Sequence, residues 1–293
     1  MDKDEVVNTN LIIVRFVVAI TILASSLAIT GCTATRPDPI AADIAWVASG
    51  EFCEPETVLP LPDDTLLVSN VCDFRERGNG FLTLLDKDGQ PLDWHIVDGL
   101  DAPLGMALIG DRLYVVDNNR LRIFRWPGYE PLETVDLGTT VANDVAAAPD
   151  GVVYVTDTAK HQVIRRSPDG TKSVLAGEAR FTGANGIALD GERLFVGGAR
   201  LWQVNLRTGS IVTIGPEWLA DIDGIELEAD GTLQLTPVAG PLVRYRDDDD
   251  IQIFAGDGIS SANHGYAPSL GLALIPTGFD NTVIAIRFAD DDQ

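Results

Sequence analysis

The sequence predicts an all-β protein, a single six-bladed β-propeller that spans most of the chain. From Ala45 onward, short runs of alternating apolar and polar residues are separated by Gly, Asp and Pro turns, which is the pattern of strands rather than helices. A turn followed by a strand recurs about every 40 residues, in units that begin at Glu56, Leu104, Asn143, Asn185, Asp223 and Asn263. Such a period is typical of propeller blades, and six units fill the chain from Glu56 to Phe288.

The two ends of the repeat region predict how the ring of blades closes. The last unit supplies three apolar runs between Asn263 and Phe288 and then ends in acidic residues. The run Ala45–Ser49, which precedes the first unit, is expected to supply the fourth strand of this last blade. Closing the ring in this way leaves no open edge between the first and last blades, where an exposed edge would promote aggregation.

Residues 1–43 are expected to lie outside the propeller. The uncharged apolar run Phe16–Ile29 has 14 residues, fewer than the roughly 20 that a helix needs to span a bilayer, and it predicts a signal peptide over residues 1–31. Its end, Ile29-Thr30-Gly31-Cys32, resembles a bacterial lipobox, so Cys32 is expected to carry a lipid at the start of a tether over residues 32–43. The propeller would then cover residues 44–293, in the bacterial cell envelope and facing the periplasm or the exterior. An uncleaved membrane anchor is the alternative.

The charge of the chain argues against two classes of partner. The formal net charge is −23, and the acidic residues are scattered along the sequence. Such a field repels nucleic acid phosphates and anionic membrane surfaces, so contact with a membrane is expected through the lipid anchor. We expect a monomer whose partner is a small-molecule substrate or ligand.

Cys53 and Cys72 are expected to form a disulfide in this oxidising compartment. They flank a predicted hairpin whose turn falls near Pro62-Asp63, at positions that oppose each other across that turn. Opposed residues of paired strands lie close enough for a disulfide bond. Two buried free thiols are the alternative.

The first residue of each unit contributes to a predicted cation site. In each blade the innermost strand comes first, and its leading side chain is expected to point towards the axial channel. Five of the six leading residues carry a side-chain oxygen, from two carboxylates and three amides. Asn185-Gly186 or Asp223-Gly224 alone could be a hairpin turn, but the units have their own turns further along, such as Asp150-Gly151. Converging oxygens of this kind favour a hard divalent cation, most readily Ca²⁺.

Six segments in blade order also carry a family resemblance. They read EPETVLPLPDDTLLVSN, DGLDAPLGMALIGDRLYVVD, ANDVA…GVVYVTD, GANGIALDGERLFVGG, DIDGIELEADG and IPTGFDNTVIAIRF. These segments resemble the senescence-marker protein, gluconolactonase and luciferin-regenerating enzyme family of six-bladed propellers, over Glu56 to Phe288. The resemblance implies a divalent cation held by Glu56, Asn185 and Asp223, with Asp223 also acting as the general base. It further implies that Asn143 contacts the substrate or a metal-bound water.

One segment departs from the pattern of that family's bacterial branch. NHGYAPS stands where the branch has Asp-Ile-Gly-Tyr-Asp, so Asn263 replaces a carboxylate and His264 is an additional polar residue. We expect Asn263 to join the cation ligands and His264 to contact the substrate or act as an outer base. A histidine packed at the channel rim is the alternative.

These observations predict a divalent-metal-dependent hydrolase that acts on a lactone or related ester in the propeller channel. The cation would polarise the carbonyl, Asp223 would activate a water molecule, and Asn143 and Asn185 would orient the substrate. The sequence contains no Gly-x-Ser-x-Gly or P-loop motif, which argues against serine-nucleophile and nucleotide chemistry. The alternative is a non-catalytic propeller that binds a small ligand or a protein, with the cation in a structural role.

Overall fold

The structure is a computed structural model that describes residues 35–177, 179–238, 240–255 and 262–288. The predicted signal peptide and Cys32 lie outside these residues. The described residues form strands and turns without a helix, which confirms the all-β prediction. Accordingly, these ranges contain no helical segment with the length and apolarity needed to cross a bilayer.

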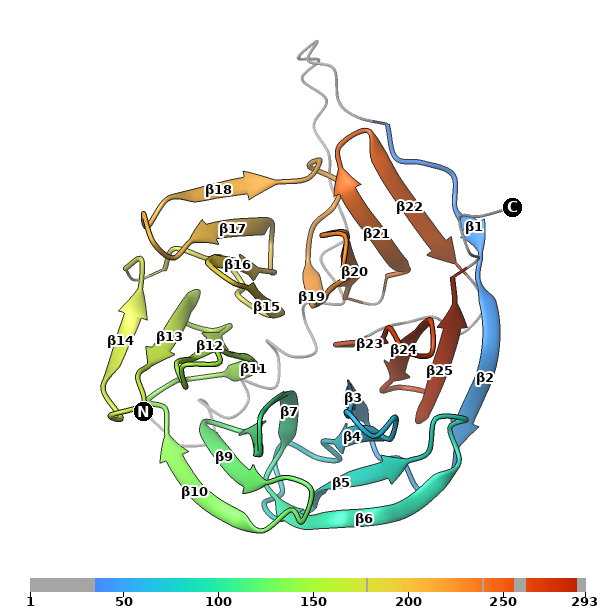
Figure 1. The fold of residues 1–293 in the computed structure, drawn as a ribbon, viewed down its shortest axis with the longest axis vertical. Helices are drawn as coiled ribbons and strands as arrows, with labels where there is room; N and C mark the ends of the chain where they lie inside the picture. The colour runs from blue at the N-terminus through green and yellow to red at the C-terminus, as the bar shows by residue number, and fades with distance from the viewer. Residues whose placement is uncertain (1–34, 178, 239, 256–261, 289–293) are drawn as a thin grey trace. The chain divides into compact units, whose positions relative to one another are not determined.

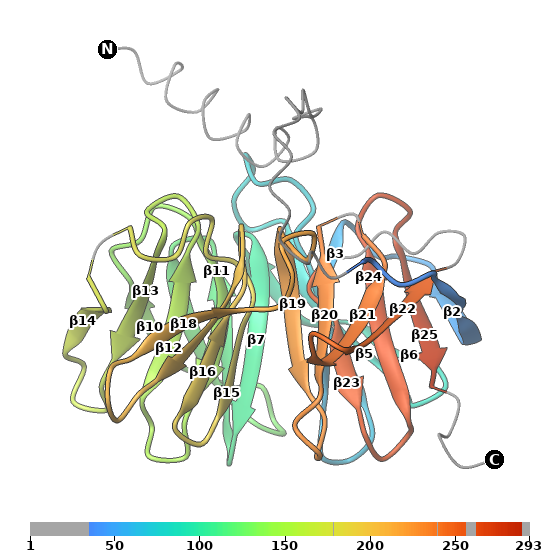
Figure 2. The ribbon, with the colours of Figure 1, turned by 90° about the horizontal axis from the view of Figure 1, so that it is seen from above.

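Six sheets stand around a common axis, which confirms the predicted six-bladed propeller (Figure 1). In blades 1 to 4 the first strand in sequence order lies innermost (Figure 1), and in blades 5 and 6 the innermost strands are β19 (Ile222–Leu227) and β23 (Gly265–Ala267). Inner strands such as β7 (Pro103–Ile109) and β19 run along the axis in the side view (Figure 2). Blades 1 to 3 consist of β3 (Pro55–Pro60), β4 (Leu66–Asn70), β5 (Gly80–Leu85), β6 (Pro91–Leu100), β7 (Pro103–Ile109), β8 (Arg112–Asp117), β9 (Arg120–Arg125), β10 (Pro131–Asp136), β11 (Ala142–Ala147), β12 (Val153–Asp157), β13 (Gln162–Arg166) and β14 (Lys172–Leu175). Blades 4 to 6 consist of β15 (Ile187–Asp190), β16 (Arg193–Val196), β17 (Leu201–Asn205), β18 (Ile211–Ile214), β19 (Ile222–Leu227), β20 (Leu233–Pro237), β21 (Leu242–Asp247), β22 (Asp250–Ala255), β23 (Gly265–Ala267), β24 (Leu272–Thr277), β25 (Thr282–Arg287) and β2 (Asp43–Ser49).

The N-terminal strand β2 closes the ring as predicted. It pairs antiparallel with β25 and supplies the outermost strand of blade 6. The structure contains a further strand that was not predicted. This strand, β1 (Ile40–Ala41), pairs in parallel with the outer strand β22 of blade 5. A strand of two residues is too short to show a period of alternation in the sequence. Since β1 starts at Ile40, part of the expected tether over residues 32–43 belongs to the propeller instead.

The core lies between neighbouring blades, where apolar side chains of one sheet contact those of the next. The second strand of blade 1, β4, is buried throughout. Between blades 2 and 3, one apolar cluster joins Leu104 and Val116 to Val145 and Val155. Packing on both faces holds each sheet in place, so the inner strands present their edges to the axis in fixed positions.

The inner strands of four of the six blades have a β-bulge at the predicted leading residues. In blade 1, Pro55 opposes Asn70 and Val58 opposes Val68, so β3 has one residue more than β4 over this stretch. The same irregularity occurs in blades 2, 3 and 5, at Leu104-Gly105, Asn143-Asp144 and Asp223. A bulge interrupts the alternation of side chains along a strand and changes the direction in which they point. Two adjacent residues of one strand can therefore both reach the region around the axis.

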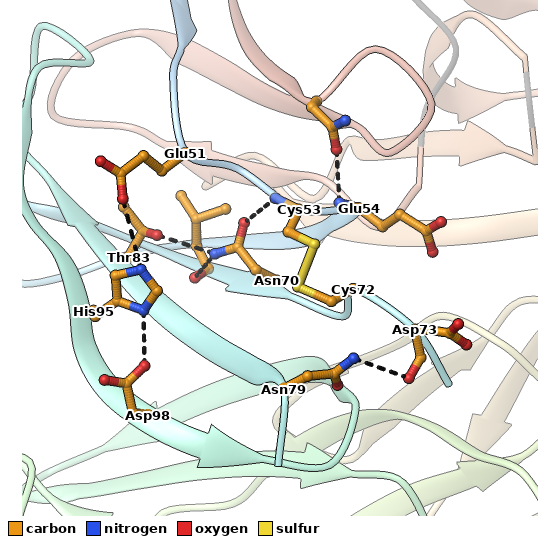
Figure 3. Close-up of a disulfide and its surroundings, with 12 residues drawn as sticks. Glu51, Cys53, Glu54, Asn70, Cys72, Asp73, Asn79, Thr83, His95 and Asp98 are labelled. Atoms are coloured by element: carbon orange, nitrogen blue, oxygen red, sulfur yellow. Dashed lines mark hydrogen bonds and ion pairs between the residues drawn. A yellow bond between two sulfur atoms is a disulfide. The ribbon is translucent and has the colours of Figure 1, made fainter. Parts of the chain in front are cut away.

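Cys53 and Cys72 are joined in a disulfide, with their Cα atoms 4.7 Å apart (Figure 3). Thiol titration of the unfolded, unreduced protein is therefore expected to find neither cysteine free. On the loop-entropy account, a disulfide that closes a loop of this length stabilises the fold by roughly 3 kcal/mol. The same titration after reduction should gain two thiols. Two reactive thiols before reduction would contradict the bond.

Candidate metal and catalytic site

Carboxylates from three blades lie close together at the inner edges of the sheets. Glu56 lies on β3, Asp144 on β11 and Asp223 on β19. Burial raises the pKa of Glu56 well above its ordinary value, and the charges of Asp223 and Asp144 raise it further. The hydrogen bond that Thr57 Oγ1 donates to Glu56 Oε2, at 2.6 Å, lowers this pKa. The predicted ligands Glu56 and Asp223 are therefore within electrostatic reach of each other.

Asp223 and Asn185 are also neighbours in the structure. Asp223 is 8 % exposed, and burial raises its pKa to about 7, although a hydrogen bond with the Asn185 side chain lowers it. The backbone N–H of Asn185 donates to Gly197 O at 3.0 Å, which holds Asn185 at the inner edge of blade 4. The Oδ1 atoms of Asn185 and Asn143 are both buried and accept no hydrogen bond from the described residues. Two amide oxygens are thus without a protein partner in this part of the chain.

Asp144 belongs to the same group, although the repeat predicted only its neighbour Asn143 at the axis. It is 4 % exposed, and its carboxylate accepts hydrogen bonds from Val145 N at 2.8 Å and Ile187 N at 3.0 Å. Burial raises the pKa of Asp144 to about 7; these two hydrogen bonds lower it and the charge of Asp223 raises it. Asp144 therefore connects blade 3 to blade 4 and adds a third carboxylate to the predicted pair.

A glycine in blade 2 makes room for Asp144. A Cβ atom on Gly105 would lie 2.1 Å from Asp144 Oδ1, far inside van der Waals contact. Any larger residue at this position would displace the carboxylate. Gly105 follows the leading residue of unit 2, so the glycine and the Asn143-Asp144 pair together are the sequence signal that could have identified Asp144.

Glu226 is a half-buried carboxylate near this group that was not predicted from the sequence. It lies on β19, three residues after Asp223. Burial raises the pKa of Glu226 to about 8, and the charge of Asp144 raises it further. Its surroundings in the sequence, DGIELEAD, are those of an ordinary half-exposed strand, and no motif marked it.

Asn263 and His264 precede the inner strand β23 of blade 6, and both are buried. Asn263 is 5 % exposed, and its side chain forms a hydrogen bond with Asp144. His264 is 1 % exposed, its Nδ1 lies 3.0 Å from Thr236 Oγ1, and its Nε2 has no partner among the described residues. Burial lowers the pKa of His264 to about 3, so the ring is neutral and a weak base. The structure thus brings Asn263 to the carboxylates and packs His264 against the inner end of blade 5.

Leu104 does not lie on the axis as its place in the repeat suggested. It is 4 % exposed and belongs to the apolar cluster between blades 2 and 3. An apolar side chain at a bulge gains more free energy in the core between blades than beside buried carboxylates.

Leu104→Ala is expected to lower the free energy of unfolding by about 2–5 kcal/mol, because it leaves a cavity in that cluster. Cation affinity of the folded protein should stay the same, since the leucine contributes no oxygen. Denaturant unfolding and a Ca²⁺ titration measure the two effects separately. Weakened cation binding with unchanged stability would contradict this placement.

The side chains around the axis offer carboxylate and amide oxygens, which are the ligand types that a hard divalent cation prefers. No group of three or more His, Cys, Asp and Glu side chains in the described ranges is arranged to hold a metal. The expected ligand set contains two carboxylates, Glu56 and Asp223, and takes its other oxygens from Asn185 and Asn263. The charges that act on the pKa values of Glu56 and Glu226 are all negative. A cation would offset this repulsion, and amide and carboxylate oxygens are the ligands that Ca²⁺ takes.

A surface pocket lies elsewhere, at the hairpin turns of blades 3 and 4. Its volume is about 300 Å³, and it is lined by Ala148, Asp150, Val152, Tyr154, Arg165, Leu189, Gly191, Glu192, Leu206 and Arg207. The pocket contains none of the predicted site residues, and the ion pair of Arg207 with Glu192 lies at its edge. The chemistry of the inner strands, rather than this pocket, therefore defines the candidate site.

No protein-family model matches the sequence, and no curated protein matches it. Solved structures do match. A gluconolactonase from Xanthomonas campestris is 17 % identical with a TM-score of 0.65, over 81 % of this chain and 88 % of its own. Virginiamycin B lyase from Staphylococcus aureus is 10 % identical with a TM-score of 0.60, over 83 % and 99 %. A chain of a nidogen/laminin complex is 16 % identical with a TM-score of 0.61, over 72 % and 84 %. At these identities the likeness shows the fold, and the chain shares its propeller architecture with a gluconolactonase, a lyase and a member of a protein complex.

Proposed function

We propose that the protein is a divalent-metal-dependent hydrolase that opens a lactone or a related ester in the propeller channel. One observation carries this proposal. Carboxylates from three blades, the half-buried Glu56 and the buried Asp144 and Asp223, have raised pKa values and influence one another, beside two amide oxygens that lack partners among the described residues. Such an arrangement is costly in an apolar core, and it is typical of a site that binds a cation or performs acid–base chemistry.

Glu56, Asp223, Asn185 and Asn263 would hold the cation. When bound, the cation would supply Lewis-acid polarisation of the substrate carbonyl. Its positive charge would also favour the ionised forms of Glu56 and Asp223 and lower their pKa values. The bonds from Val145 N and Ile187 N fix the Asp144 carboxylate, so Asp144 would support the ligands from blade 3.

Asp223 would act as the general base. Its carboxylate would take a proton from the water that attacks the carbonyl carbon, and the carbon–oxygen bond of the ester would then break. The leaving oxygen would regain a proton, which gives a carboxylic acid and an alcohol, or a hydroxy acid from a lactone. The cation would keep the Asp223 carboxylate ionised, which is the form that accepts a proton. The free Oδ1 of Asn143 could accept a hydrogen bond from a substrate hydroxyl and orient the ring.

Metal analysis followed by a panel of lactones and esters, with and without a chelator, tests the proposal. The purified protein is expected to bind a divalent cation and to hydrolyse at least one substrate class, and the chelator should abolish that activity. Cation binding without turnover of any substrate would contradict the catalytic part. Turnover that survives complete removal of metal would contradict the role of the cation.

A non-catalytic binding propeller is the second candidate. It is favoured by the hydrogen bonds that Asp144 receives, because a carboxylate that ties two blades together can be purely structural. The member of the nidogen/laminin complex shows that this fold also occurs in protein complexes. In that case the cation would hold the inner strands together, and a ligand would bind without turnover.

A further inference from the structure

The Cys53–Cys72 disulfide lies immediately before the strand that carries Glu56. It continues the β3–β4 hairpin beyond its strands (Figure 3). There, Cys72 N donates to Cys53 O at 3.0 Å and Val71 N donates to Glu54 O at 3.2 Å. Both cysteines are half-buried, so a small reductant can reach the bond. The disulfide therefore holds the segment that leads into β3 against the end of β4.

Blades 2 and 3 hold the equivalent segment in another way. Asp117 ends the second strand of blade 2, and its Oδ1 accepts hydrogen bonds from Asp101 N at 2.7 Å and Ala102 N at 2.8 Å. Asp157 has the equivalent role in blade 3, where its Oδ2 accepts a hydrogen bond from Thr140 N at 3.0 Å and its Oδ1 accepts one from Val141 N at 3.1 Å. In both blades a buried carboxylate thus fixes two backbone groups of the segment that leads to the bulge.

Blade 1 lacks this carboxylate. Asn70 occupies the same register, opposite Pro55, as Asp117 does opposite Pro103 and Asp157 opposite Ala142. Asn70 Oδ1 accepts one hydrogen bond from this segment, from Cys53 N at 3.1 Å, and its amide nitrogen donates to Thr83 Oγ1 at 3.0 Å (Figure 3). Glu54 corresponds to the second donor of blades 2 and 3, but its N–H bonds to Asn281 of blade 6 and not to the second strand of its own blade. The disulfide instead supplies a covalent link between Cys53 and Cys72 at this end of the hairpin.

Two residues at the disulfide have an uncommon backbone conformation. Glu54 has φ 48° and Cys72 has φ 58°, in the left-handed region that residues other than glycine rarely adopt. Glu54 N also donates to Asn281 Oδ1 of blade 6, at 2.7 Å. Two residues after Glu54, the bulge sets the direction of the Glu56 side chain, so relaxation of this segment would move Glu56.

We infer that the Cys53–Cys72 disulfide positions Glu56 in the channel, and that the cation affinity of the site depends on the bond being intact. The two cysteines are positioning residues, since they act through the backbone of β3 and do not touch the axis. The claim about cation affinity rests on the proposed function, whereas the claim about the position of Glu56 does not.

Reduction by a dithiol tests both claims. The dithiol delivers two electrons and two protons, breaks the sulfur–sulfur bond to leave two thiols, and is itself oxidised to a cyclic disulfide. Hydrogen exchange measured by mass spectrometry should speed up at least 10-fold in residues 54–58 on reduction. Residues 142–147 of blade 3, which Asp157 secures, should exchange as before. Calorimetric titration with Ca²⁺ should show at least a 10-fold loss of affinity in the reduced, folded protein.

Two variants separate positioning from stability. Cys53→Ser/Cys72→Ser should reproduce the effect of reduction in the absence of dithiol. Ile253→Ala is the control, because Ile253 is 0 % exposed in the outer strand β22 and its truncation destabilises the fold away from Glu56. Ile253→Ala should lower stability and keep full Ca²⁺ affinity. Equal exchange in residues 54–58 of oxidised and reduced protein would overturn the inference, as would equal Ca²⁺ affinity. If the oxidised protein binds no Ca²⁺, the proposed function fails, and the exchange measurement alone decides this inference.

Discussion

Replacing Asp223 by asparagine is expected to lower the rate of lactone or ester hydrolysis by about 10²- to 10⁴-fold. The substitution keeps the size of the side chain and one oxygen, and it removes the carboxylate proposed to take the proton of the attacking water. Cation affinity should also fall, because Asp223 is one of two carboxylates in the proposed ligand set. Values of kcat/KM measured at saturating cation separate the loss of the base from the loss of the cation.

Glu56→Gln is the matched control for this prediction. It removes the other carboxylate ligand without removing the proposed base, so added cation should restore part of its activity. Added cation should not restore Asp223→Asn. Asn263→Asp should tighten cation binding, because it adds a carboxylate beside the same oxygens. If Asp223→Asn binds the cation and turns over every tested ester like the wild type, the catalytic proposal is wrong, and the binding propeller takes its place.

The architecture could be predicted because it repeats. Each blade carries the same order of apolar runs and turns, and six copies in register leave few other folds open. The closing strand was predictable for a related reason, since the last unit has three strands and Ala45–Ser49 was the apolar run left over. The strand β1 was not predictable, because two residues show no alternation and their pairing depends on the free edge of β22.

The candidate site could be predicted only in part, because the sequence does not indicate where the β-bulges occur. Alternation along a strand implies that Asn143 and Asp144 point to opposite faces, so only one of them was assigned to the axis. In the structure the bulge between Ala142 and Val145 breaks this alternation, and Asp144 joins Asp223. The presence of a bulge depends on the register between two strands, which no single segment of sequence encodes.

Leu104 shows the converse effect. It aligns with the polar leading residues in the repeat, yet its side chain packs between blades 2 and 3. Position in a repeat predicts where a backbone lies, and the chemistry of the side chain then selects between the axis and the core. The repeat alone therefore placed Leu104 of blade 2 at the channel wrongly, and it did not predict Asp144 of blade 3 or Glu226 of blade 5 there.

The metal-free protein is expected to lose stability as the pH rises from about 4 to about 8. The folded pKa values of Asp144 and Asp223 are about 7 against ordinary values of 3.8, and that of Glu226 is about 8 against 4.5. The folded state therefore binds these protons more tightly than the unfolded state does. The slope of the unfolding free energy against pH is proportional to the number of protons bound by the unfolded state minus the number bound by the folded state. This difference is negative within the window, so stability falls there, and it is close to zero above the window, so stability levels off.

Two other groups affect the curve without reversing it. Burial lowers the pKa of His264 to about 3, so this histidine contributes stability above its unfolded pKa and loses it as the pH falls. The folded state binds three extra protons at Asp144, Asp223 and Glu226, and it binds at most one fewer at His264. The net effect of pH on stability therefore keeps its sign. The hydrogen bond from the backbone N–H of Thr232 lowers the pKa of Asp230 to about 2. Asp230 therefore loses its contribution to stability only at a pH below the window of the three raised carboxylates.

A bound cation should remove most of this dependence on pH. It favours the ionised carboxylates and brings their folded pKa values back towards ordinary ones. Urea unfolding at several pH values, in EDTA and in Ca²⁺, measures the effect, and each unit of raised pKa corresponds to about 1.4 kcal/mol. Ca²⁺ at about 100 times its dissociation constant should stabilise the fold by about 2.7 kcal/mol, and by more at high pH than at low pH. Asp223→Asn has one titrating group fewer and should show a shallower slope in EDTA. A flat profile in EDTA that Ca²⁺ leaves unchanged would contradict a cation site among these carboxylates, because protons and a divalent cation compete for the same oxygens.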